Sequence, residues 1–500
     1  IAFTEDVLKR YESYGWHTQR VDWTKTGEYV EDVQELYSAL LAAKAETSKP
    51  SIISLRTIIG YPAPKKQNTG KIHGSALGAE EVAGLKEVLG FDPAKSFQIE
   101  DEVLAHARAA TERGAQARAA WQEGFEAWQS ANPEAAALLE RVEAKHLPSG
   151  IDAALPTFEA GKDVSTRAAS GKVLNALGPL MPELWGGSAD LAESNNTTIE
   201  GSPSFIPASR STEAWKGNPY GRVLHFGIRE HAAASIVNGI SLHGRTRAFS
   251  GTFLIFSDYQ KPAIRLSALM GVPSIYVWSH DSIGLGEDGP THQPVEQLST
   301  LRAIPGLDVV RPADANEVGV AWKTMLENHE NPAGIVLTRQ NVPVFARGTG
   351  AAQGDTFGST AGVAKGGYVL AEASSNGATV PAQVLLIATG SEVQLAVSAR
   401  EALQAEGIPT RVISMPCVEW FTKQDAAYRE SVLPATVKAR VSVEAGLALG
   451  WKEFVGDAGR SISLEHYGAS ADYKRLFQEF GITAEAVAAA AKDSLAAASN

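Results

Sequence analysis

The sequence has almost no cysteine, no long apolar run and a shortage of basic residues, and each of these excludes a class of protein. Cys417 is the single cysteine in 500 residues, so an internal disulfide framework and a multi-cysteine zinc site are both excluded. No apolar run approaches the ~20 residues that a membrane-spanning helix needs. The formal net charge of −12 argues against broad nucleic-acid binding, because a polyanion would be repelled. We therefore expect a globular cytoplasmic protein, with Cys417 a buried or incidental thiol.

The composition is that of an ordinary globular protein, 44% hydrophobic and 20% charged. A chain of 500 residues exceeds one hydrophobic core and predicts several domains. Residues 1–3 carry no initiator methionine and no signal-peptide pattern, and an amphipathic segment follows at once at 5–14. We expect the chain to begin inside a domain.

Strand and helix patterns alternate along much of the chain, which predicts an α/β fold of successive doubly wound, mostly parallel-sheet domains. Early in the chain, a helix is expected at 31–45, a strand at 51–55, a long loop at 60–78 and helical structure at 100–146. In the middle part, the expected strands are 222–226, 273–278, 307–310 and 334–338, and the expected helices are 229–242, 253–269, 294–304 and 316–326. Later strands are expected at 382–388, 411–414, 440–443 and 461–464.

The segment 279–294, SHDSIGLGEDGPTHQP, is the most informative loop. Gly284, Gly286 and Gly289 form a literal G-x-G-x-x-G, which in a dinucleotide site must open a helix against a pyrophosphate. Here a proline follows the last glycine, and two acids inside the motif would repel the phosphates. We reject this match, which is the only support for a nicotinamide oxidoreductase. Two histidines and three acids in one loop instead favour binding of substrate hydroxyls and proton transfer.

The core of this loop, GEDGPTHQP, closely resembles the transketolase family, and further matches follow in the family's order along nearly the whole chain. They are FTEDV at 3–7, YGWH at 14–17, IHGSALG at 72–78, TR at 166–167, GGSADL at 186–191, FGIREH at 226–231, GTFLIF at 251–256, RLSAL at 265–269, SHDSIG at 279–284, RPADANE at 311–317 and LTRQN at 337–341. Since close variants of the loop occur in deoxyxylulose-phosphate synthases, the ordered set makes the resemblance specific.

The resemblance implies thiamine diphosphate as cofactor. In this family a carboxyl group contacts the pyrimidine ring nitrogen N1′ and so promotes loss of a carbon-bound proton from the cofactor, and Glu230 matches that position. Phe253, Phe256 and Tyr259 match the aminopyrimidine pocket, where aromatic contacts supply affinity and orientation. If the segment 253–269 is helical, these three rings share one helix face. Asp190 matches a position near the cofactor and the subunit contact.

The resemblance also implies sugar-phosphate substrates of the xylulose 5-phosphate, ribose 5-phosphate and erythrose 4-phosphate type. The positions that match phosphate-binding residues are Arg167, Ser194, His280 and Arg339, and arginine suits this task because its planar donors engage phosphate oxygens in pairs. Asp288 matches the residue that distinguishes the configuration of the C2 hydroxyl. His73 and His292 match histidines that contact substrate hydroxyls and assist proton transfer, and His73 also matches a cofactor contact.

The family holds the cofactor's diphosphate through a divalent cation, Mg²⁺ or Ca²⁺, with ligands in and after a Gly-Asp-Gly segment. This sequence has no Gly-Asp-Gly, and it begins at the stretch that follows that segment in the family. We therefore expect the N-terminal part of the diphosphate-binding domain to be lacking, no metal ligand within this chain, and weak binding of thiamine diphosphate by the chain alone.

The resemblance implies a homodimeric transferase of the pentose phosphate pathway, with active sites between subunits. The expected parts are the end of the diphosphate-binding domain at 1–115, a helical linker at 116–149, the pyrimidine-binding domain at 150–347 and a C-terminal domain at 358–500. The alternatives are a related thiamine enzyme, such as dihydroxyacetone synthase or deoxyxylulose-phosphate synthase, and a non-catalytic scaffold.

Overall fold

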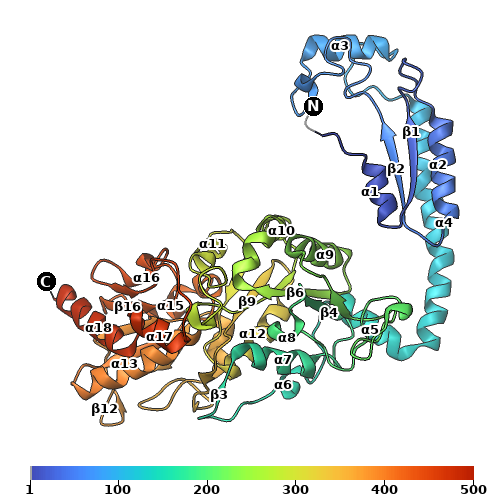
Figure 1. Ribbon diagram of the computed structural model, residues 1–500. Helices are drawn as coiled ribbons and strands as arrows, with labels where there is room; N and C mark the ends of the chain where they lie inside the picture. The colour runs from blue at the N-terminus through green and yellow to red at the C-terminus, as the bar shows by residue number, and fades with distance from the viewer. Residues whose placement is uncertain (1–2, 500) are drawn as a thin grey trace. The chain divides into compact units, whose positions relative to one another are not determined.

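The computed structural model describes residues 3–499 and divides into two compact units, one up to Trp128 and one from Gln129 onward. Unit 1 contains a short parallel sheet in which β1 (His17–Asp22) pairs with β2 (Ser51–Arg56). Its helices are α1 (Val7–Ser13), α2 (Val33–Ala45), α3 (Ala79–Val88) and α4 (Asp101–Ala131), the last of which ends just inside unit 2. Figure 1 shows α1 and α2 beside the two strands, and both helices pack on them.

The local chemistry of unit 1 accounts for these elements. Asp32 caps α2, because its carboxylate accepts a hydrogen bond from the main-chain N–H of Glu35 at 2.9 Å. The long loop after β2 contains a single 3₁₀ turn, η1 (Gly70–Ile72). The rings of Trp121 and Phe125 stack along α4 with centroids 4.7 Å apart. The helix, strand and loop predicted in this unit are confirmed.

Unit 2 contains a six-stranded sheet in the order β5-β4-β6-β7-β9-β8, and every neighbouring pair is parallel. The strands are β4 (Leu184–Ser188), β5 (Val223–His225), β6 (Arg247–Phe253), β7 (Ile275–Ser279), β8 (Asp308–Val310) and β9 (Ala333–Leu337). The main helices around it are α5 (Pro133–Glu143), α7 (Thr166–Leu177), α9 (Glu230–His243), α10 (Ser257–Met270), α11 (Gln297–Arg302) and α12 (Ala315–Glu327). The four predicted strands of this region lie within two residues of the observed bounds, whereas β4 and β6 were not predicted.

Helices cover both faces of this sheet. In Figure 1, α9 and α10 lie on one side and α7 and α12 on the other. Strand β7 is buried along its whole length: Ile275 and Val277 join one hydrophobic cluster, and Tyr276 and Trp278 join another. Because successive side chains of a strand point to opposite faces, both faces are apolar, as in other covered parallel sheets.

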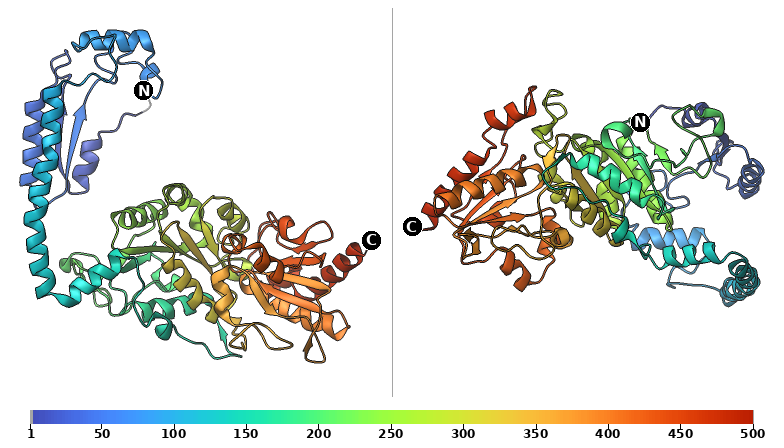
Figure 2. Two further views of the ribbon diagram at one scale, coloured as in Figure 1. Left: turned by 180° about the vertical axis from the view of Figure 1, so that it is seen from behind. Right: turned by 90° about the horizontal axis from the view of Figure 1, so that it is seen from below.

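A second sheet follows in unit 2 with the order β11-β15-β14-β16-β17. Its strands are β11 (Tyr368–Ala371), β14 (Val384–Ala388), β15 (Thr410–Ser414), β16 (Ala439–Val443) and β17 (Arg460–Ile462), parallel except for β11. Its helices include α13 (Val393–Ala405), α14 (Val418–Thr422), α15 (Ala426–Val432), α16 (Lys452–Val455), α17 (Tyr473–Glu479) and α18 (Ala484–Ala498). Figure 2 shows the sheet between its helices in two further views.

The two sheets confirm the predicted α/β class, and the later strands match their predicted positions. Cys417 is completely buried, as one of the two interpretations expected, and burial raises the pKa of its thiol. Within residues 3–499, no helix combines the length and the apolar character needed to cross a membrane.

Candidate active site

The carboxyl edge of the six-stranded sheet gathers residues that the sequence indicated. Asp190 follows β4, Glu230 follows β5, and Phe253 ends β6. His280 follows β7, and Arg339 follows β9. Open parallel sheets bind ligands at this edge, in the crevice outside the strand ends. The fold therefore places at one edge five residues that are far apart in the sequence.

Aromatic and imidazole rings form a stack at this edge. The Phe253 ring faces that of His280 with centroids 3.6 Å apart and planes inclined by 23°. Phe256 lies 6.0 Å from Phe253 and nearly parallel to it, and Tyr259 lies 6.1 Å from Phe256. His292 meets Phe256 edge-on at 5.5 Å. Tyr259, the last ring of the stack, is 64% exposed. The stack therefore ends in an apolar surface that a ligand can reach.

A cavity of about 420 Å³ opens beside these rings. It is lined by Ala189, Asp190, Leu191, Ile228, Glu230, Phe256 and Tyr259. Glu230 is the first residue of α9 and is half-buried, and within the part of the chain that the structure describes its carboxylate has no ion-pair or hydrogen-bond partner. Asp190 in the same lining also has no ion-pair or hydrogen-bond partner among the described residues. Apolar walls with free carboxylates suit a flat heterocycle that offers a ring nitrogen.

A cluster of cationic groups lies on the other side of the Phe253 ring. Arg167 donates a hydrogen bond to the main-chain oxygen of Ser194 at 2.7 Å, and burial together with the charge of Arg339 lowers the pKa of Arg167. Burial, then Arg167, Arg339 and His292, lower the pKa of His280 to about 3. His280 is therefore neutral at physiological pH. Two guanidinium groups that repel each other beside a neutral imidazole suit an anion such as phosphate.

The loop 279–294 carries the remaining candidates. His292 shares a hydrogen bond of 2.9 Å with the Thr291 hydroxyl, and Asp288 is exposed. Only a 3₁₀ turn, η4 (Ile283–Leu285), forms among the glycines, and the next helix, α11, begins at Gln297. Because no helix starts at the glycines, the geometry of a dinucleotide site is absent from this loop, in agreement with its rejection.

Sequence reasoning missed the contact between this loop and the C-terminal sheet domain. Gln293 donates to the main-chain oxygens of Gly286 at 2.8 Å and Ala469 at 3.0 Å. A Cβ added at Gly289 would lie 2.2 Å from the hydroxyl of Ser470. The segment before α17 therefore packs directly against the loop that presents Asp288.

Arg311 fixes the base of the same loop to the second sheet. Its guanidinium is completely buried and donates to Asp281 at 2.7 and 3.0 Å, to the Thr389 hydroxyl at 2.9 Å and to Glu392. Burial opposes the charge, but Glu392 and Asp281 outweigh it and raise the pKa of Arg311. The motif RPADANE contained this arginine, but nothing in the sequence indicated its partners.

His73 lies in unit 1, at the exposed end of η1. No group of three or more His, Cys, Asp or Glu side chains in residues 3–499 is arranged to hold a metal ion.

The expected helix at 253–269 is wrong at its start. Phe253 is the last residue of β6, Phe256 lies in the 3₁₀ turn η3 (Leu254–Phe256), and Tyr259 lies in α10. The three rings still come together, but through a strand-to-helix turn rather than along one helix face. Pro262 is accommodated inside α10.

Three family models match the chain. The thiamine diphosphate binding domain of transketolase matches residues 1–148, the transketolase pyrimidine binding domain matches 162–344, and the transketolase-like C-terminal domain matches 366–483. The first match covers the start of the chain, so it does not support the expectation that the N-terminal part of this domain is lacking.

Among curated proteins, the chain is 57% identical over 498 residues to the transketolases of Mycobacterium bovis and Mycobacterium tuberculosis, covering 99% of this chain and 69% of each relative. It is 46% identical over 488 residues to that of Geobacillus stearothermophilus, covering 97% of this chain and 69% of that relative. Among solved structures, it is similar to a transketolase mutant from Pichia stipitis in complex with xylulose-5-phosphate, with 38% identity and a TM-score of 0.88 over 99% of this chain and 69% of that one. A transketolase complex with sedoheptulose-7-phosphate from the same organism has 39% identity and a TM-score of 0.88 over the same shares.

Proposed function

The chain belongs to the transketolase family of thiamine diphosphate-dependent enzymes, and from this premise we propose that it transfers a two-carbon ketol unit from a ketose phosphate to an aldose phosphate. The observation that carries the proposal is the cavity at Glu230, whose carboxylate has no ion-pair partner among the described residues and faces the walls formed by Phe256 and Tyr259. The proposal places the enzyme in the pentose phosphate pathway and in the cytoplasm.

The cavity fits the aminopyrimidine end of thiamine diphosphate. When bound, this cofactor supplies the reactive ring carbon and the electron sink. Glu230 would hydrogen-bond to the ring nitrogen N1′ and hold a proton there, while Phe256 and Tyr259 orient the ring and exclude water. Asp190, in the same cavity, would contact the cofactor or the subunit boundary. Mg²⁺ or Ca²⁺ accompanies the cofactor in this proposal, and we assign no described residue to the metal.

The cationic cluster fits the substrate's phosphate. Arg167 and Arg339 would bind the phosphate oxygens, with His280 as a donor and Ser194 holding Arg167 in place. The sugar-phosphate complexes of the Pichia stipitis relatives support this class of substrate.

Nearer the reacting carbons, Asp288 would distinguish the C2 hydroxyl, and His292 would pass protons to substrate oxygens. The contact of His292 with Phe256 supports this role, because it places the imidazole beside the proposed cofactor pocket.

The proposal includes a homodimer whose active sites combine His73 of one subunit with Glu230 and His292 of the other. Co-expression of His73→Ala and Glu230→Gln chains tests it. If each site uses both subunits, a mixed dimer keeps one site with both native residues, so the mixture regains up to about a quarter of wild-type activity. If each site lies within one subunit, the mixture stays as inactive as the two parents.

The activity itself is tested with xylulose 5-phosphate and ribose 5-phosphate in the presence of thiamine diphosphate and Mg²⁺. Formation of sedoheptulose 7-phosphate is the expected result. Its absence would favour another thiamine enzyme, such as dihydroxyacetone synthase or deoxyxylulose-phosphate synthase. A non-catalytic scaffold instead predicts that Glu230 can be replaced without functional loss.

A further inference from the structure

A chain of buried hydrogen bonds runs from the interior of the six-stranded sheet to the imidazole of His280. Its members are Ser188 at the end of β4, Asn195 at the end of the short helix α8 (Ala192–Asn195), and Ser279 at the end of β7. The hydroxyl of Ser188 approaches the main-chain oxygen of Gly251 at 3.0 Å, and Nδ2 of Asn195 approaches the hydroxyl of Ser188 at 2.6 Å. The hydroxyl of Ser279 lies 2.5 Å from Oδ1 of Asn195 and 2.7 Å from Nδ1 of His280. All four side chains are buried.

The direction of every bond in this hydrogen-bond chain follows from its first acceptor. A main-chain oxygen only accepts, so the single proton of the Ser188 hydroxyl is used on Gly251. Ser188 must then accept from Asn195, which places the amide nitrogen on that side and the amide oxygen towards Ser279. The Ser279 hydroxyl gives its proton to this oxygen, because an amide oxygen cannot donate. Ser279 therefore accepts from His280, and the imidazole carries its proton on Nδ1.

The other ring nitrogen of His280, Nε2, takes no part in the hydrogen-bond chain. It makes no hydrogen bond within residues 3–499, and part of its surface is accessible. The charged and titratable groups around the ring are Arg167, Arg339, His292 and, next in the chain, Asp281, which pairs with Arg311. Burial, then the two guanidinium groups of Arg167 and Arg339, lower the pKa of His280 to about 3, so the ring holds a single proton. With that proton on Nδ1, Nε2 carries a lone pair.

We propose that the hydrogen-bond chain fixes His280 as the neutral tautomer with its proton on Nδ1, so that a substrate phosphate is held at Nε2 only together with one extra proton. The inference rests on the proposed function, in which the phosphate lies between two arginines and His280. Phosphate oxygens are acceptors, and a lone pair on Nε2 repels them. A proton placed between a phosphate oxygen and Nε2 replaces this repulsion by a charge-assisted hydrogen bond. Ser188, Asn195 and Ser279 are positioning residues that act through His280.

The proposal makes phosphate binding depend on pH. A phosphate monoester loses its second proton near pH 6, so well above that pH both the free phosphate and the free imidazole lack the extra proton. Binding then takes up about one proton per site, and by linkage the dissociation constant rises up to about tenfold for each pH unit. If His280 carried its proton on Nε2 instead, the site would bind the phosphate dianion without proton uptake.

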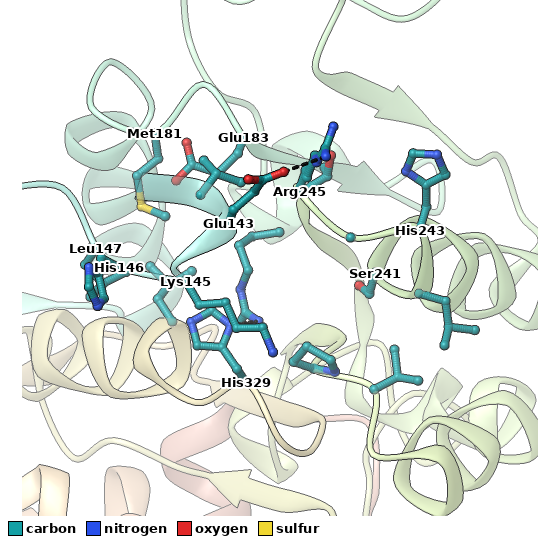
Figure 3. Close-up of a pocket in the computed structure, with 18 of the residues that line it drawn as sticks. Glu143, Lys145, His146, Leu147, Met181, Glu183, Ser241, His243, Arg245 and His329 are labelled. Carbon is teal, nitrogen blue, oxygen red and sulfur yellow. Dashed lines mark hydrogen bonds and ion pairs between the residues drawn. The ribbon is translucent and has the colours of Figure 1, made fainter. Parts of the chain in front are cut away.

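NMR on the free protein, labelled at histidine, measures the tautomer directly, because the shifts of the ring nitrogens show which one carries the proton. His280→Asn identifies the signal among those of the 11 histidines. His329 is an internal reference for the opposite tautomer. Burial lowers its pKa to about 4, and its Nδ1 lies 3.3 Å from a guanidinium nitrogen of Arg247, which only donates, so its proton lies on Nε2. Figure 3 shows His329 near Lys145, in the wall of a cavity at the start of β6. A proton on Nε2 of His280 would overturn the proposal.

Proton uptake is measured by calorimetric titration of the holoenzyme with ribose 5-phosphate at pH 8, in two buffers of different ionisation enthalpy. The wild type is expected to take up about one proton per site, and His280→Asn, whose amide donates without an extra proton, about none. Ser279→Ala removes the acceptor of the Nδ1 proton and is expected to lower the uptake by at least about half, because the proton can then move to Nε2. Ser267→Ala is the matched control and is expected to keep the full uptake, since this buried serine binds Ile264 and Tyr276 instead.

The proposal is contradicted if the wild type takes up no proton or if Ser279→Ala leaves the uptake unchanged. If Ser279→Ala does not fold, the NMR result for the wild type decides. A wild type that does not bind ribose 5-phosphate counts against the proposed function, and the tautomer of His280 in the free protein then decides on the hydrogen-bond chain. The two failures are therefore distinguishable.

Discussion

Replacement of Arg311 by methionine tests how the substrate loop is fixed to the C-terminal sheet domain. The guanidinium binds Asp281 at the base of the loop and Glu392 before α13, and all three side chains are completely buried. Arg311→Met keeps much of the volume but leaves two carboxylates buried without a countercharge. Removing one partner of a buried ion pair costs about 3–5 kcal/mol. We expect a loss of this size in the free energy of unfolding at neutral pH.

The pH dependence gives this prediction a second test. Burial already raises the pKa of Glu392 above its ordinary value of 4.5, while Arg311 lowers it, so removing Arg311 raises that pKa further. An acid with a raised folded-state pKa binds more protons in the folded state, so folding is destabilised as pH rises above 4.5. The stability deficit of Arg311→Met is therefore largest at neutral pH and shrinks as the pH falls towards 4.5.

The assay is urea unfolding followed at several pH values, with the Michaelis constant for xylulose 5-phosphate measured in parallel. Lys452→Met is the matched control, because Lys452 forms an exposed ion pair with Asp457 at 3.0 Å, and such pairs contribute about 0–1 kcal/mol. A raised Michaelis constant is expected for Arg311→Met, since the loop that carries Asp288 and His292 loses its anchor. A loss below about 1 kcal/mol, equal at pH 5 and pH 7.5, would refute the reasoning.

Three further outcomes are expected. Arg167→Leu raises the Michaelis constant for ribose 5-phosphate about 10- to 100-fold with little change in turnover, because it removes a charged hydrogen bond to the phosphate; steady-state kinetics measure this. Phe256→Ala weakens thiamine diphosphate binding about tenfold, measured by calorimetry, because it removes the wall next to Glu230. Between pH 6.5 and pH 4, the free energy of unfolding is expected to fall by about 2–3 kcal/mol less in His280→Asn than in the wild type, and urea unfolding at the two pH values measures this. The folded-state pKa of His280 is lowered from 6.5 to about 3, so its stabilising contribution is present above pH 6.5 and lost as the pH falls.

The sequence predicted the strands that are rich in branched and aromatic residues, such as β7 and β14. It did not predict β6, because RAFSGTF contains glycine and two hydroxyl residues, and a strand buried on both faces shows no alternation. Phe253, Phe256 and Tyr259 are spaced three residues apart, which is also the spacing of one helix face, so the sequence predicted a helix where the structure has a strand-to-helix turn.

The sequence predicted the residues of the candidate site only where they lie in a motif of the family. Glu230, His280 and Arg339 were expected to bind cofactor or substrate because they lie in family motifs, and the structure shows that each follows a strand at the same sheet edge. The partners of Arg311 were not predictable, since Asp281 and Glu392 lie 30 and 81 positions away in the sequence and in different domains.

Replacement of Glu230 by glutamine is the most direct test of the whole account. Glutamine preserves the size of the side chain but cannot hold a proton at the cofactor's ring nitrogen as a carboxyl group does. In the purified holoenzyme, with cofactor occupancy verified, we expect sedoheptulose 7-phosphate formation by Glu230→Gln to fall about 10²- to 10⁴-fold. Activity within threefold of wild type at full occupancy would contradict the central role of this carboxylate.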